Sequence, residues 1–418
     1  MNGKYEKVVY AAGSLGSEEY RRVIAALHVA VNEQKYNNIC FDFSKCTAAY
    51  PAGILPILSY VLALKNSNID FSLTLPEDEL VARRFRNSNW AHLIEPRKYE
   101  PAKTRGSTPS SVLTFKTDVE QQDCVNKLVD GILSTVSNLR RSDLAAVEWA
   151  LNEITDNVLN HSQSQIGGMV QLTVHRQRRR AIEFTVCDGG LGVANTLRNA
   201  HPAITSDLDA LTEAVKEGVT RNSTTNQGNG LFGSFEVCRL SKGRFKLHAN
   251  FARLELNNDH VSYRPEKIPF SGTLVDATID LADAGRLDQA LKFKGKVHRP
   301  SDIVEFKYET DNLQVVNFTM TKEARSFASR VAGKPVKTKL SNLAEMCPNQ
   351  KIVIDFSGVS VISSSFADEV FGMLFLELRP MRFMTTFGFR NASPTITGLI
   401  DRAIALRAQQ GALESGQN

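Results

Sequence analysis

The sequence predicts a multidomain protein of mixed α and β structure, in which an α+β sandwich lies between two smaller αβ domains. Two observations lead to this prediction. A strand-helix unit near the N-terminus recurs near the C-terminus, and the middle of the chain places helical patterns before a run of strand patterns. With 418 residues, 42% of them hydrophobic and 23% charged, the chain is long enough for several cores.

The repeat is marked by the tripeptide Asp-Phe-Ser. In residues 37–44 an apolar strand pattern ends at this tripeptide, and an apolar helical pattern follows over residues 53–64. Residues 350–378 repeat the strand, tripeptide, connector and helix in the same order, so that Asp42 corresponds to Asp355. We therefore predict a duplicated αβ domain, at residues 1–100 and 300–418. Two unrelated αβ units are the alternative.

The middle of the chain has a different pattern. Residues 101–116 are rich in Pro, Ser, Thr and charge and are predicted to be a linker, followed by a central domain over residues 117–285. Two helical patterns come first, at residues 118–139 and 143–161. Strand patterns follow at residues 169–175, 181–188, 243–249, 253–257 and 272–281. Helices followed by sequence-adjacent antiparallel strands indicate an α+β sandwich.

Charge and cysteine usage argue against several classes of protein. Fifty Lys and Arg against 45 Asp and Glu give a formal net charge of +5, which is too small for this length to indicate a nucleic-acid or membrane-surface partner. The six cysteines are scattered and form no CxxC pair, which argues against a zinc site and against a disulfide framework. The most apolar run, residues 48–64, is short and interrupted by Pro51 and Pro56. We expect a cytoplasmic protein.

The stretch NEITDNVLNHS, residues 152–162, suggests a ligand site. Glu153, Asn157 and His161 are four residues apart, so on a helix their side chains lie on one slowly drifting stripe and can converge on one ligand. A solvated helix face is the alternative interpretation for Glu153 and Asn157. For His161 the alternative is a helix-end histidine that binds the last carbonyl groups.

Three glycine-containing segments follow this stripe, CDGGLG after a strand pattern, QGNGLFG before a helical pattern and SGTLVDATI at the start of the last strand. In this order, the four segments resemble the N box, the two glycine boxes and the final Gly-Thr of the GHKL ATPases, the superfamily of gyrase, the heat-shock chaperone, sensor histidine kinases and MutL-type proteins. The resemblance covers roughly residues 117–281. It implies a Bergerat α/β sandwich that binds ATP with Mg²⁺.

The resemblance implies a role for each polar side chain, and the chemistry of the side chains agrees. Asn157 is expected to offer its amide oxygen to a Mg²⁺ ion already held by phosphates, because Mg²⁺ prefers hard oxygen ligands. Glu153 is expected to take the proton from the water or hydroxyl that attacks the γ-phosphate. Asp188 is expected to accept a hydrogen bond from the adenine amine, which selects ATP over GTP because guanine presents a carbonyl there.

The other ATP-binding candidates are Gly190, Gly192, Gly228, Gly230, Gly233 and Thr273. The first two glycines let the backbone turn beside the base, and those of QGNGLFG let N–H groups approach phosphate oxygens at a helix start. The threonine is expected to add a hydroxyl near adenine through Asp188. Phe232 stands where the superfamily commonly has glycine, and the long polar segment 193–227 is interpreted as a mobile lid.

The flanking domains resemble STAS domains, the fold of anti-anti-sigma factors, and the C-terminal copy is similar to a STAS-like family of unknown function. In STAS regulators a serine at the strand-to-helix connector accepts phosphate, which makes Ser364 in VISSSFADE the possible phosphoacceptor. The usual Asp-Ser-Ser-Gly has become Ser-Ser-Ser-Phe, and Ser365 is expected to cap the helix. The N-terminal copy has Pro51 near this position and is predicted to be degenerate.

The sequence thus predicts a three-part regulator that uses Mg-ATP for serine-kinase-like phosphotransfer or for ATP hydrolysis coupled to its STAS-like domains. The expected partners are ATP and either another protein or a second copy of the chain, bound through the STAS-like domains. The alternative is a non-catalytic nucleotide-sensing scaffold in a stress or defence response, which Phe232 and the altered acceptor motif favour. A gyrase-like or MutL-like DNA role ranks third, because the net charge is near neutral.

Overall fold

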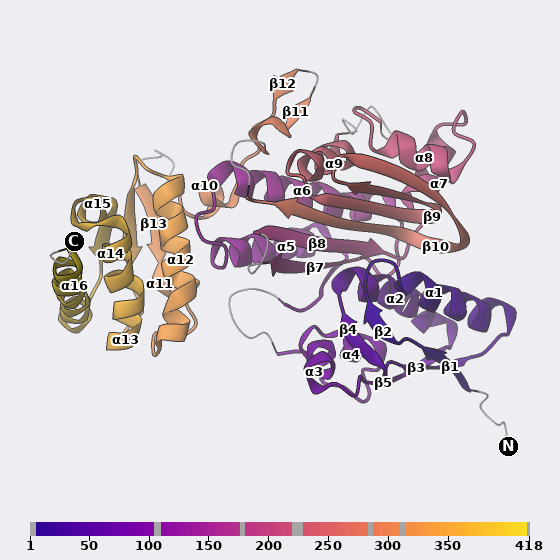
Figure 1. Ribbon diagram of the computed structural model, residues 1–418, viewed down its shortest axis with the longest axis horizontal. Coiled ribbons are helices and arrows are strands. Elements are labelled where there is room, and N and C mark those ends of the chain that lie inside the picture. The colour runs from indigo at the N-terminus through magenta and orange to yellow at the C-terminus, as the bar shows by residue number, and fades with distance from the viewer. Residues whose placement is uncertain are drawn as a thin grey trace. The chain divides into compact units, whose positions relative to one another are not determined.

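The computed structural model describes residues 6–103, 110–175, 180–219, 229–282, 287–293, 295–309 and 315–415. The chain divides into two compact units, residues 1–128 with 146–299 and residues 129–145 with 300–418. Parallel and antiparallel sheets both occur, which confirms the mixed α and β fold class (Figure 1). In the part of the chain that the structure describes, no helix is both long and apolar enough to cross a membrane.

The N-terminal part of the first unit, here called the N-terminal layer, is built on a parallel sheet with the strand order β1-β3-β5. Its elements are β1 (Glu6–Tyr10), β2 (Gly13–Leu15), α1 (Tyr20–His28), η1 (Val29–Glu33), β3 (Asn38–Asp42), β4 (Cys46–Ala49), α2 (Pro51–Leu64), η2 (Lys65–Ser67), β5 (Asp70–Thr74), α3 (Glu79–Asn87) and α4 (Trp90–Ile94). Strands β2 and β4 form a separate parallel pair. The predicted order of strand, connector and apolar helix is confirmed by β3 and α2.

The rest of the first unit is built on an antiparallel sheet, here called the central sheet, with the strand order β6-β7-β8-β10-β9. The elements are β6 (Leu113–Phe115), α5 (Asp118–Leu133), α6 (Arg141–His161), β7 (Gly168–His175), β8 (Ala181–Asp188), α7 (Val193–Ala200), α8 (Asp207–Ala214), α9 (Gly230–Leu240), β9 (Arg244–Asn257), β10 (His260–Asp280), η3 (Leu287–Gln289), β11 (Lys292–Phe293) and β12 (Lys296–Val297). The predicted linker 101–116 contains β6, which pairs with β7. The two strands predicted within residues 243–257 are a single strand, β9, in which Asn250 adopts a φ of +51°.

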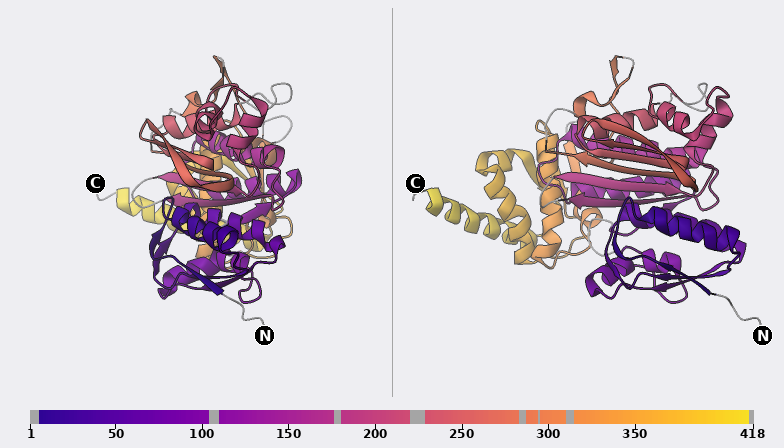
Figure 2. Two further views of the ribbon diagram at one scale, coloured as in Figure 1. Left: turned by 90° about the vertical axis from the view of Figure 1, so that its right-hand side faces the viewer. Right: turned by 45° about the vertical axis from the view of Figure 1, so that its right-hand side comes forward.

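The two faces of the central sheet have different neighbours, because side chains alternate along a strand. Cys187 on β8 and Leu274 on β10 share one hydrophobic core with the N-terminal layer. Val186 and Val275, the next residues along, line a cavity on the opposite face. Helices α1 and α2 therefore lie between the two sheets of the first unit (Figure 2).

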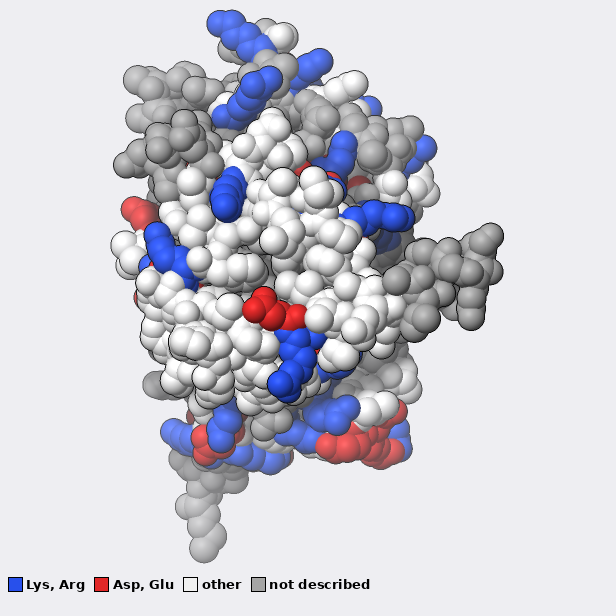
Figure 3. Space-filling model, turned by 90° about the vertical axis from the view of Figure 1, so that its left-hand side faces the viewer, with Lys and Arg blue, Asp and Glu red and all other residues white. Residues whose placement is uncertain are grey.

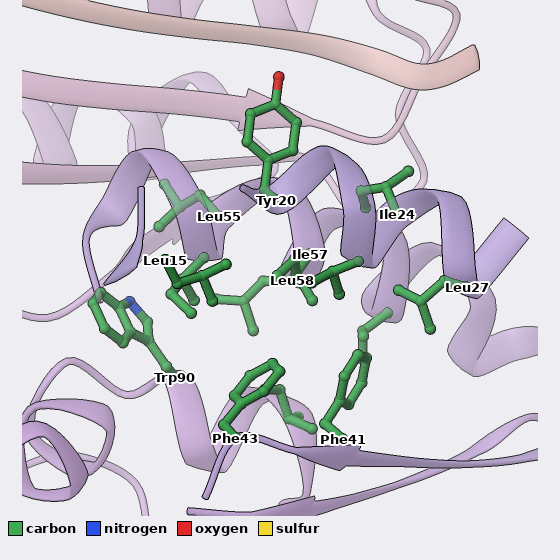
Figure 4. Close-up of a cluster of buried hydrophobic side chains, with 14 of the residues drawn as sticks. Leu15, Tyr20, Ile24, Leu27, Phe41, Phe43, Leu55, Ile57, Leu58 and Trp90 are labelled. Carbon is green, nitrogen blue, oxygen red and sulfur yellow. The ribbon is translucent and has the colours of Figure 1, made fainter. Parts of the chain in front are cut away.

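Aromatic side chains dominate the core that the N-terminal layer shares with the central sheet. Figure 4 shows Phe41 and Phe43 directed toward the underside of α2, while Tyr20 points away from them toward the central strands. Trp90 is fully buried, and its Nε1 donates a hydrogen bond to Gln171 Oε1 on β7 at 2.8 Å. Because a buried indole N–H needs an acceptor, this bond fixes where α4 meets the central sheet.

A partly buried ionic network joins α1 and the segment before it to the hairpin of β9 and β10. Its cations are Arg21, Lys246 and Arg253, and its carboxylates are Glu18, Glu255 and Glu266. Arg253 is 1% exposed, and its guanidinium lies 2.7 Å from the Glu18 carboxylate and 3.0 Å from that of Glu255. Beside the network, the Tyr20 hydroxyl and His248 Nδ1 are 2.6 Å apart. Burying a guanidinium is tolerable here because several carboxylates compensate its charge.

Acidification is expected to destabilise this junction through His248. Burial, together with the nearby cations Arg253, Arg21 and Lys246, lowers the pKa of His248 to about 3. An unfolded histidine has a pKa near 6.5, so between these values the unfolded chain binds a proton that the folded protein does not. The contribution of this group to stability is therefore complete above about pH 6.5 and falls below it, by about 1.4 kcal/mol per pH unit.

Urea unfolding at about pH 7.5 and about pH 5.5 tests this expectation in the wild type and in His248→Gln. The wild type should lose roughly 1 kcal/mol more stability on acidification than the variant does. His260→Gln, at the exposed start of β10, is the matched control and should keep the wild-type pH dependence. The same pH dependence in all three proteins would contradict a neutral, buried His248.

The second unit is built on a parallel sheet with the strand order β13-β14-β15. As in the three-stranded sheet of the N-terminal layer, the strands lie side by side in the order in which they occur along the chain. Its elements, besides the end of α5 and the start of α6, are α10 (Ile303–Lys307), β13 (Val315–Thr319), α11 (Met320–Glu323), α12 (Arg330–Met346), β14 (Lys351–Asp355), α13 (Ser364–Ala367), η4 (Asp368–Gly372), α14 (Met373–Leu378), α15 (Pro380–Thr386), β15 (Phe387–Arg390) and α16 (Pro394–Ser415).

The repeated Asp-Phe-Ser ends the middle strand of each parallel sheet in the same way. The carboxylate of Asp42 accepts a hydrogen bond from Ser44 N at 3.0 Å, and that of Asp355 accepts one from Ser357 N at 2.9 Å. Each aspartate thus closes an Asx turn. The repeat seen in the sequence is therefore a repeat of local structure.

The turn between α5 and α6 packs against α12 within the second unit. The fully buried side chain of Asn342 donates hydrogen bonds to Leu133 O at 2.8 Å and Val136 O at 2.7 Å. Its Oδ1 accepts a third from Leu139 N at 3.1 Å. The carbonyl groups at the end of a helix need such partners, so Asn342 satisfies the end of α5 from outside that helix.

The face that Figure 3 shows, on the side where α14, α15 and α16 are drawn in Figure 1, carries few charged side chains. The second unit also exposes large apolar residues. Met381 and Met384 on α15 are 80% and 67% exposed, and Phe389 on β15 is 41% exposed. Exposed apolar side chains that gather in one place often mark an interaction surface.

Candidate functional site

A cavity of about 390 Å³ lies between α6 and the central sheet, on the face opposite the N-terminal layer. Its walls come from α6, the end of β8, α7, the start of α9 and β10. The cavity brings together seven of the residues that the sequence singled out, Glu153, Asn157, His161, Asp188, Gly192, Gly230 and Thr273. They come from separate parts of the chain, so the fold assembles them in one place.

Helix α6 presents its four-residue stripe to this cavity. Glu153, Asn157 and His161 all line it, one turn apart. On another side of α6, Thr155 Oγ1 accepts a hydrogen bond from Gln121 Nε2 on α5 at 2.6 Å. This bond to α5 helps to fix the rotation of α6 about its axis. Glu153 and Asn157 are accordingly half-buried at a cavity rather than on an exposed helix face.

Glu153 lies against the start of α9. A Cβ atom on Gly230 would be 2.5 Å from Glu153 Oε2, so a side chain at this position would displace the Glu153 carboxylate. Burial, and to a lesser degree the charge of Asp156, raises the pKa of Glu153 to about 7. A carboxylate with such a pKa is suited to accept a proton near neutral pH.

Asp188 ends β8 and is 1% exposed. Its Oδ1 accepts a hydrogen bond from Gly190 N at 2.8 Å and its Oδ2 accepts one from Thr273 N at 3.1 Å. Burial raises the pKa of Asp188 to about 7, although these hydrogen bonds act in the opposite direction. A Cβ atom on Gly272, where φ is +97°, would lie 2.1 Å from Asp188 O, so the neighbouring strand approaches without a side chain.

Gly192 and Thr273 shape the start of α7. Gly192 has a φ of +82°, and a Cβ atom there would lie 2.6 Å from Asn250 Oδ1. The Thr273 hydroxyl accepts a hydrogen bond from Val193 N at 3.0 Å. Thr273 contacts Asp188 through both its backbone amide and its side chain, and its hydroxyl also accepts the hydrogen bond that holds the first turn of α7.

The remaining predicted glycines do not line the cavity in the part of the chain that the structure describes. Gly190 turns the backbone so that its N–H reaches Asp188, and a Cβ atom there would lie 2.0 Å from Ser162 O. Gly233 is buried inside α9, where its N–H donates to Asn229 O at 2.7 Å. Gly228 lies outside the described residues.

Asn229 is a lining residue that the sequence reasoning missed. Its Oδ1 is buried, and none of the described groups gives it a hydrogen bond. A buried acceptor of this kind costs free energy unless a ligand or water satisfies it. Its position beside Gly230 in QGNGLFG was the available signal.

The apolar walls were also missed. They include Ile154 and Val158 on α6, Val186 on β8, Leu197 on α7 and Val275 on β10. Apolar walls with one buried carboxylate at their edge suit a planar heterocycle that carries an amine. The segment interpreted as a mobile lid begins instead with α7 and α8, which pack against β9.

The donor set of the cavity fits a magnesium ion that arrives with phosphates. Asn157 offers one neutral amide oxygen, and Mg²⁺ commonly takes its other ligands from water and substrate phosphates. The start of α9 lies beside this amide, since a Cβ atom on Gly230 would be 3.4 Å from Asn157 Nδ2. Helix N-termini favour phosphate groups because their N–H groups are unpaired and their dipole is positive.

Ser364 lies in the second unit, at the first residue of α13, and is exposed. The helix cap is Ser363 rather than the predicted Ser365, because Ser363 Oγ accepts a hydrogen bond from Phe366 N at 3.0 Å. Ser365 Oγ in turn lies 3.0 Å from Ser363 Oγ. Two of the three serines therefore have a local structural role, and Ser364 is left facing solvent.

Comparison with known proteins identifies one part of the chain. Residues 332–397 match the family model of a STAS-like domain of unknown function (DUF4325). Residues 332–397 form a STAS-like domain. This match confirms that the predicted C-terminal flank contains a STAS-like domain, and it runs from α12 through Ser364 and β15 into α16. No curated protein matches the chain.

Proposed function

We propose that the cavity beside α6 binds ATP with Mg²⁺ and that the protein is a signalling regulator of the GHKL type. The observation that carries this proposal is the convergence of Glu153, Asn157 and Asp188, with the backbone around Gly192 and Gly230, on one cavity. The layout supports it too, because helices precede an antiparallel sheet and the cavity lies between them, as a Bergerat sandwich requires. Under this proposal STAS-like domains flank the central sandwich on both sides.

In the proposed complex each end of the nucleotide has its own partner. Asp188, fixed by the amides of Gly190 and Thr273, accepts the adenine amine between apolar walls. Asn157 holds Mg²⁺, which neutralises phosphate charge, and the first N–H groups of α9 face the phosphates. Glu153 takes the proton of the attacking water or hydroxyl.

The fate of the γ-phosphate involves the STAS-like domain. An exposed hydroxyl at a helix start, as Ser364 has, suits a phosphoacceptor, and a water molecule in its place makes the protein an ATPase switch. A protein partner or a second copy of the chain binds the STAS-like domains, and this binding depends on whether phosphate has been transferred or released. The exposed apolar side chains of α15 support this last part of the proposal.

A non-catalytic nucleotide sensor is the second candidate. One observation favours it, namely that Ser363 caps α13 and Ser365 lies within hydrogen-bond distance of Ser363, so two of the three serines have a structural role that needs no phosphotransfer. In such a sensor ATP occupancy alone would set the partner surface.

Incubation of the full-length protein with Mg²⁺ and γ-labelled ATP tests the proposal. We expect the wild type to consume ATP and Glu153→Ala to fail to do so. Label that stays on the chain and is lost in Ser364→Ala, but not in the neighbouring control Ser365→Ala, would establish phosphotransfer. Free phosphate would establish hydrolysis, and ATP binding without either product would favour the sensor. A wild type that does not bind ATP would overturn the proposal.

A further inference from the structure

The N-terminal layer reaches the loop that carries Asp188. Ser59 on α2 is 1% exposed, and its hydroxyl donates a hydrogen bond to the backbone carbonyl oxygen of Asp188 at 2.7 Å. Asp188 is itself 1% exposed, and its carboxylate opens onto the cavity on the other face of the central sheet. A residue of the N-terminal layer therefore holds the backbone of the proposed adenine-binding residue.

This loop has little room to shift. A Cβ atom on Gly189 would lie 3.3 Å from Ser59 Oγ and 3.1 Å from Ile166 Cδ1. On the opposite side, Gly272 approaches so closely that a Cβ atom there would meet Asp188 O at 2.1 Å. The Asp188 carbonyl oxygen is thus in contact with both α2 and β10, and a displacement of α2 away from the sheet would remove its hydrogen bond to Ser59. Sub-ångström placement of a polar group matters for recognition, because hydrogen bonds weaken steeply with distance and angle.

The contact belongs to a series across the central sheet. Trp90 bonds to Gln171 on β7, Ser59 bonds to Asp188 on β8, and Tyr20 lies within hydrogen-bond distance of His248 on β9. Each contact is buried, and two of the side chains that make them, Tyr20 and Trp90, belong to the cluster of apolar side chains in Figure 4. The N-terminal layer consequently docks along the sheet at several strands rather than through a single loop.

We infer that the N-terminal layer is a built-in regulator of nucleotide affinity, in which Ser59 is a positioning residue that holds Asp188 in the geometry that recognises adenine. The inference rests on the proposed ATP site. Docking of the layer and binding of ATP then favour each other, because a coupling free energy between two sites acts equally in both directions. A partner that pulls α2 away from the sheet would lower ATP affinity without touching the cavity.

Equilibrium binding of Mg-ATP and Mg-inosine triphosphate to the full-length chain tests this inference. Inosine has a carbonyl in place of the amine from which Asp188 is proposed to accept a hydrogen bond, so the ratio of the two affinities reports on recognition of this edge of the base. Ser59→Ala should weaken ATP binding by roughly fivefold to thirtyfold, the cost of a lost buried hydrogen bond, and should weaken inosine triphosphate binding much less. Ser88→Ala, at another buried serine of the N-terminal layer, is the control and should bind both nucleotides as the wild type does.

A second measurement uses the wild type alone, in case Ser59→Ala does not fold. Amide hydrogen exchange in α2 should slow when Mg-ATP is added, because ATP binding favours the docked layer. Unchanged exchange in α2, or unchanged ATP affinity and an unchanged affinity ratio in a folded Ser59→Ala, would overturn the inference and leave the ATP site standing. A wild type that does not bind ATP would overturn both.

Discussion

Replacing Glu153 with glutamine is expected to reduce ATP turnover by about 10²- to 10⁴-fold, the usual contribution of a general base, and to leave ATP affinity nearly unchanged. Glutamine keeps the shape of the side chain against Gly230 but cannot take a proton. Turnover by the wild type should also rise with pH through about 7, because burial raises the pKa of Glu153 to about 7 and only its ionised form is a base.

Steady-state turnover between about pH 5.5 and pH 8.5, with ATP binding measured in parallel, checks this expectation. Asp156→Asn is the matched control on the same helix, because the Asp156 charge contributes to the raised pKa of Glu153. That variant should remain active, with the midpoint of its profile shifted to lower pH. Wild-type turnover in Glu153→Gln would show that another group is the base.

Replacing Asp188 with asparagine is expected to weaken ATP binding by about 10- to 150-fold and to abolish the preference for ATP over GTP. The carboxylate accepts hydrogen bonds through both oxygens, from Gly190 N and Thr273 N. In asparagine the side-chain NH₂ group would face one of these backbone N–H donors. Toward the base it would place a second donor against the exocyclic amine of adenine, which is itself a donor.

Competition between ATP and GTP for the same cavity measures this effect. Asp276→Asn is the matched control, because Asp276 lies on β10 with its side chain toward the other face, where it accepts a hydrogen bond from Thr185. Desolvation raises the pKa of Asp276 to about 7, as it does for Asp188, so both variants remove an acid whose pKa is raised. Equal losses of ATP affinity in the two variants would mean that Asp188 supports the stability of the fold and does not bind the base.

The features that the sequence predicts well are those with a short-range physical cause. The duplicated strand and helix could be found because Asp42 and Asp355 close the same kind of turn in both copies. The stripe of α6 could be found because a four-residue spacing fixes one helix face whatever surrounds the helix. Asp188 could be placed at a strand end because β8 is a short segment rich in apolar and β-branched residues and is followed directly by glycines.

The features that were missed depend on contacts between distant parts of the chain. Ser59, Tyr20 and Trp90 look like residues of an apolar core, and their bonds to the central sheet exist only because the N-terminal layer covers its second face. The left-handed conformation of Asn250 within β9 was not foreseen either, because a strand pattern does not reveal it. The helix cap is Ser363 rather than the predicted Ser365, because α13 begins at Ser364, two residues before the start that a cap at Ser365 implies.

The cavity beside α6 is proposed to bind ATP with Mg²⁺. Calorimetric titration of the full-length protein with ATP measures this binding without relying on turnover. The predicted result is saturable binding of one ATP per chain that requires Mg²⁺ for full affinity and is weakened in Asp188→Asn. The absence of saturable binding up to about 1 mM ATP, where even a weak site of about −4 kcal/mol would be half-filled, would contradict the claim.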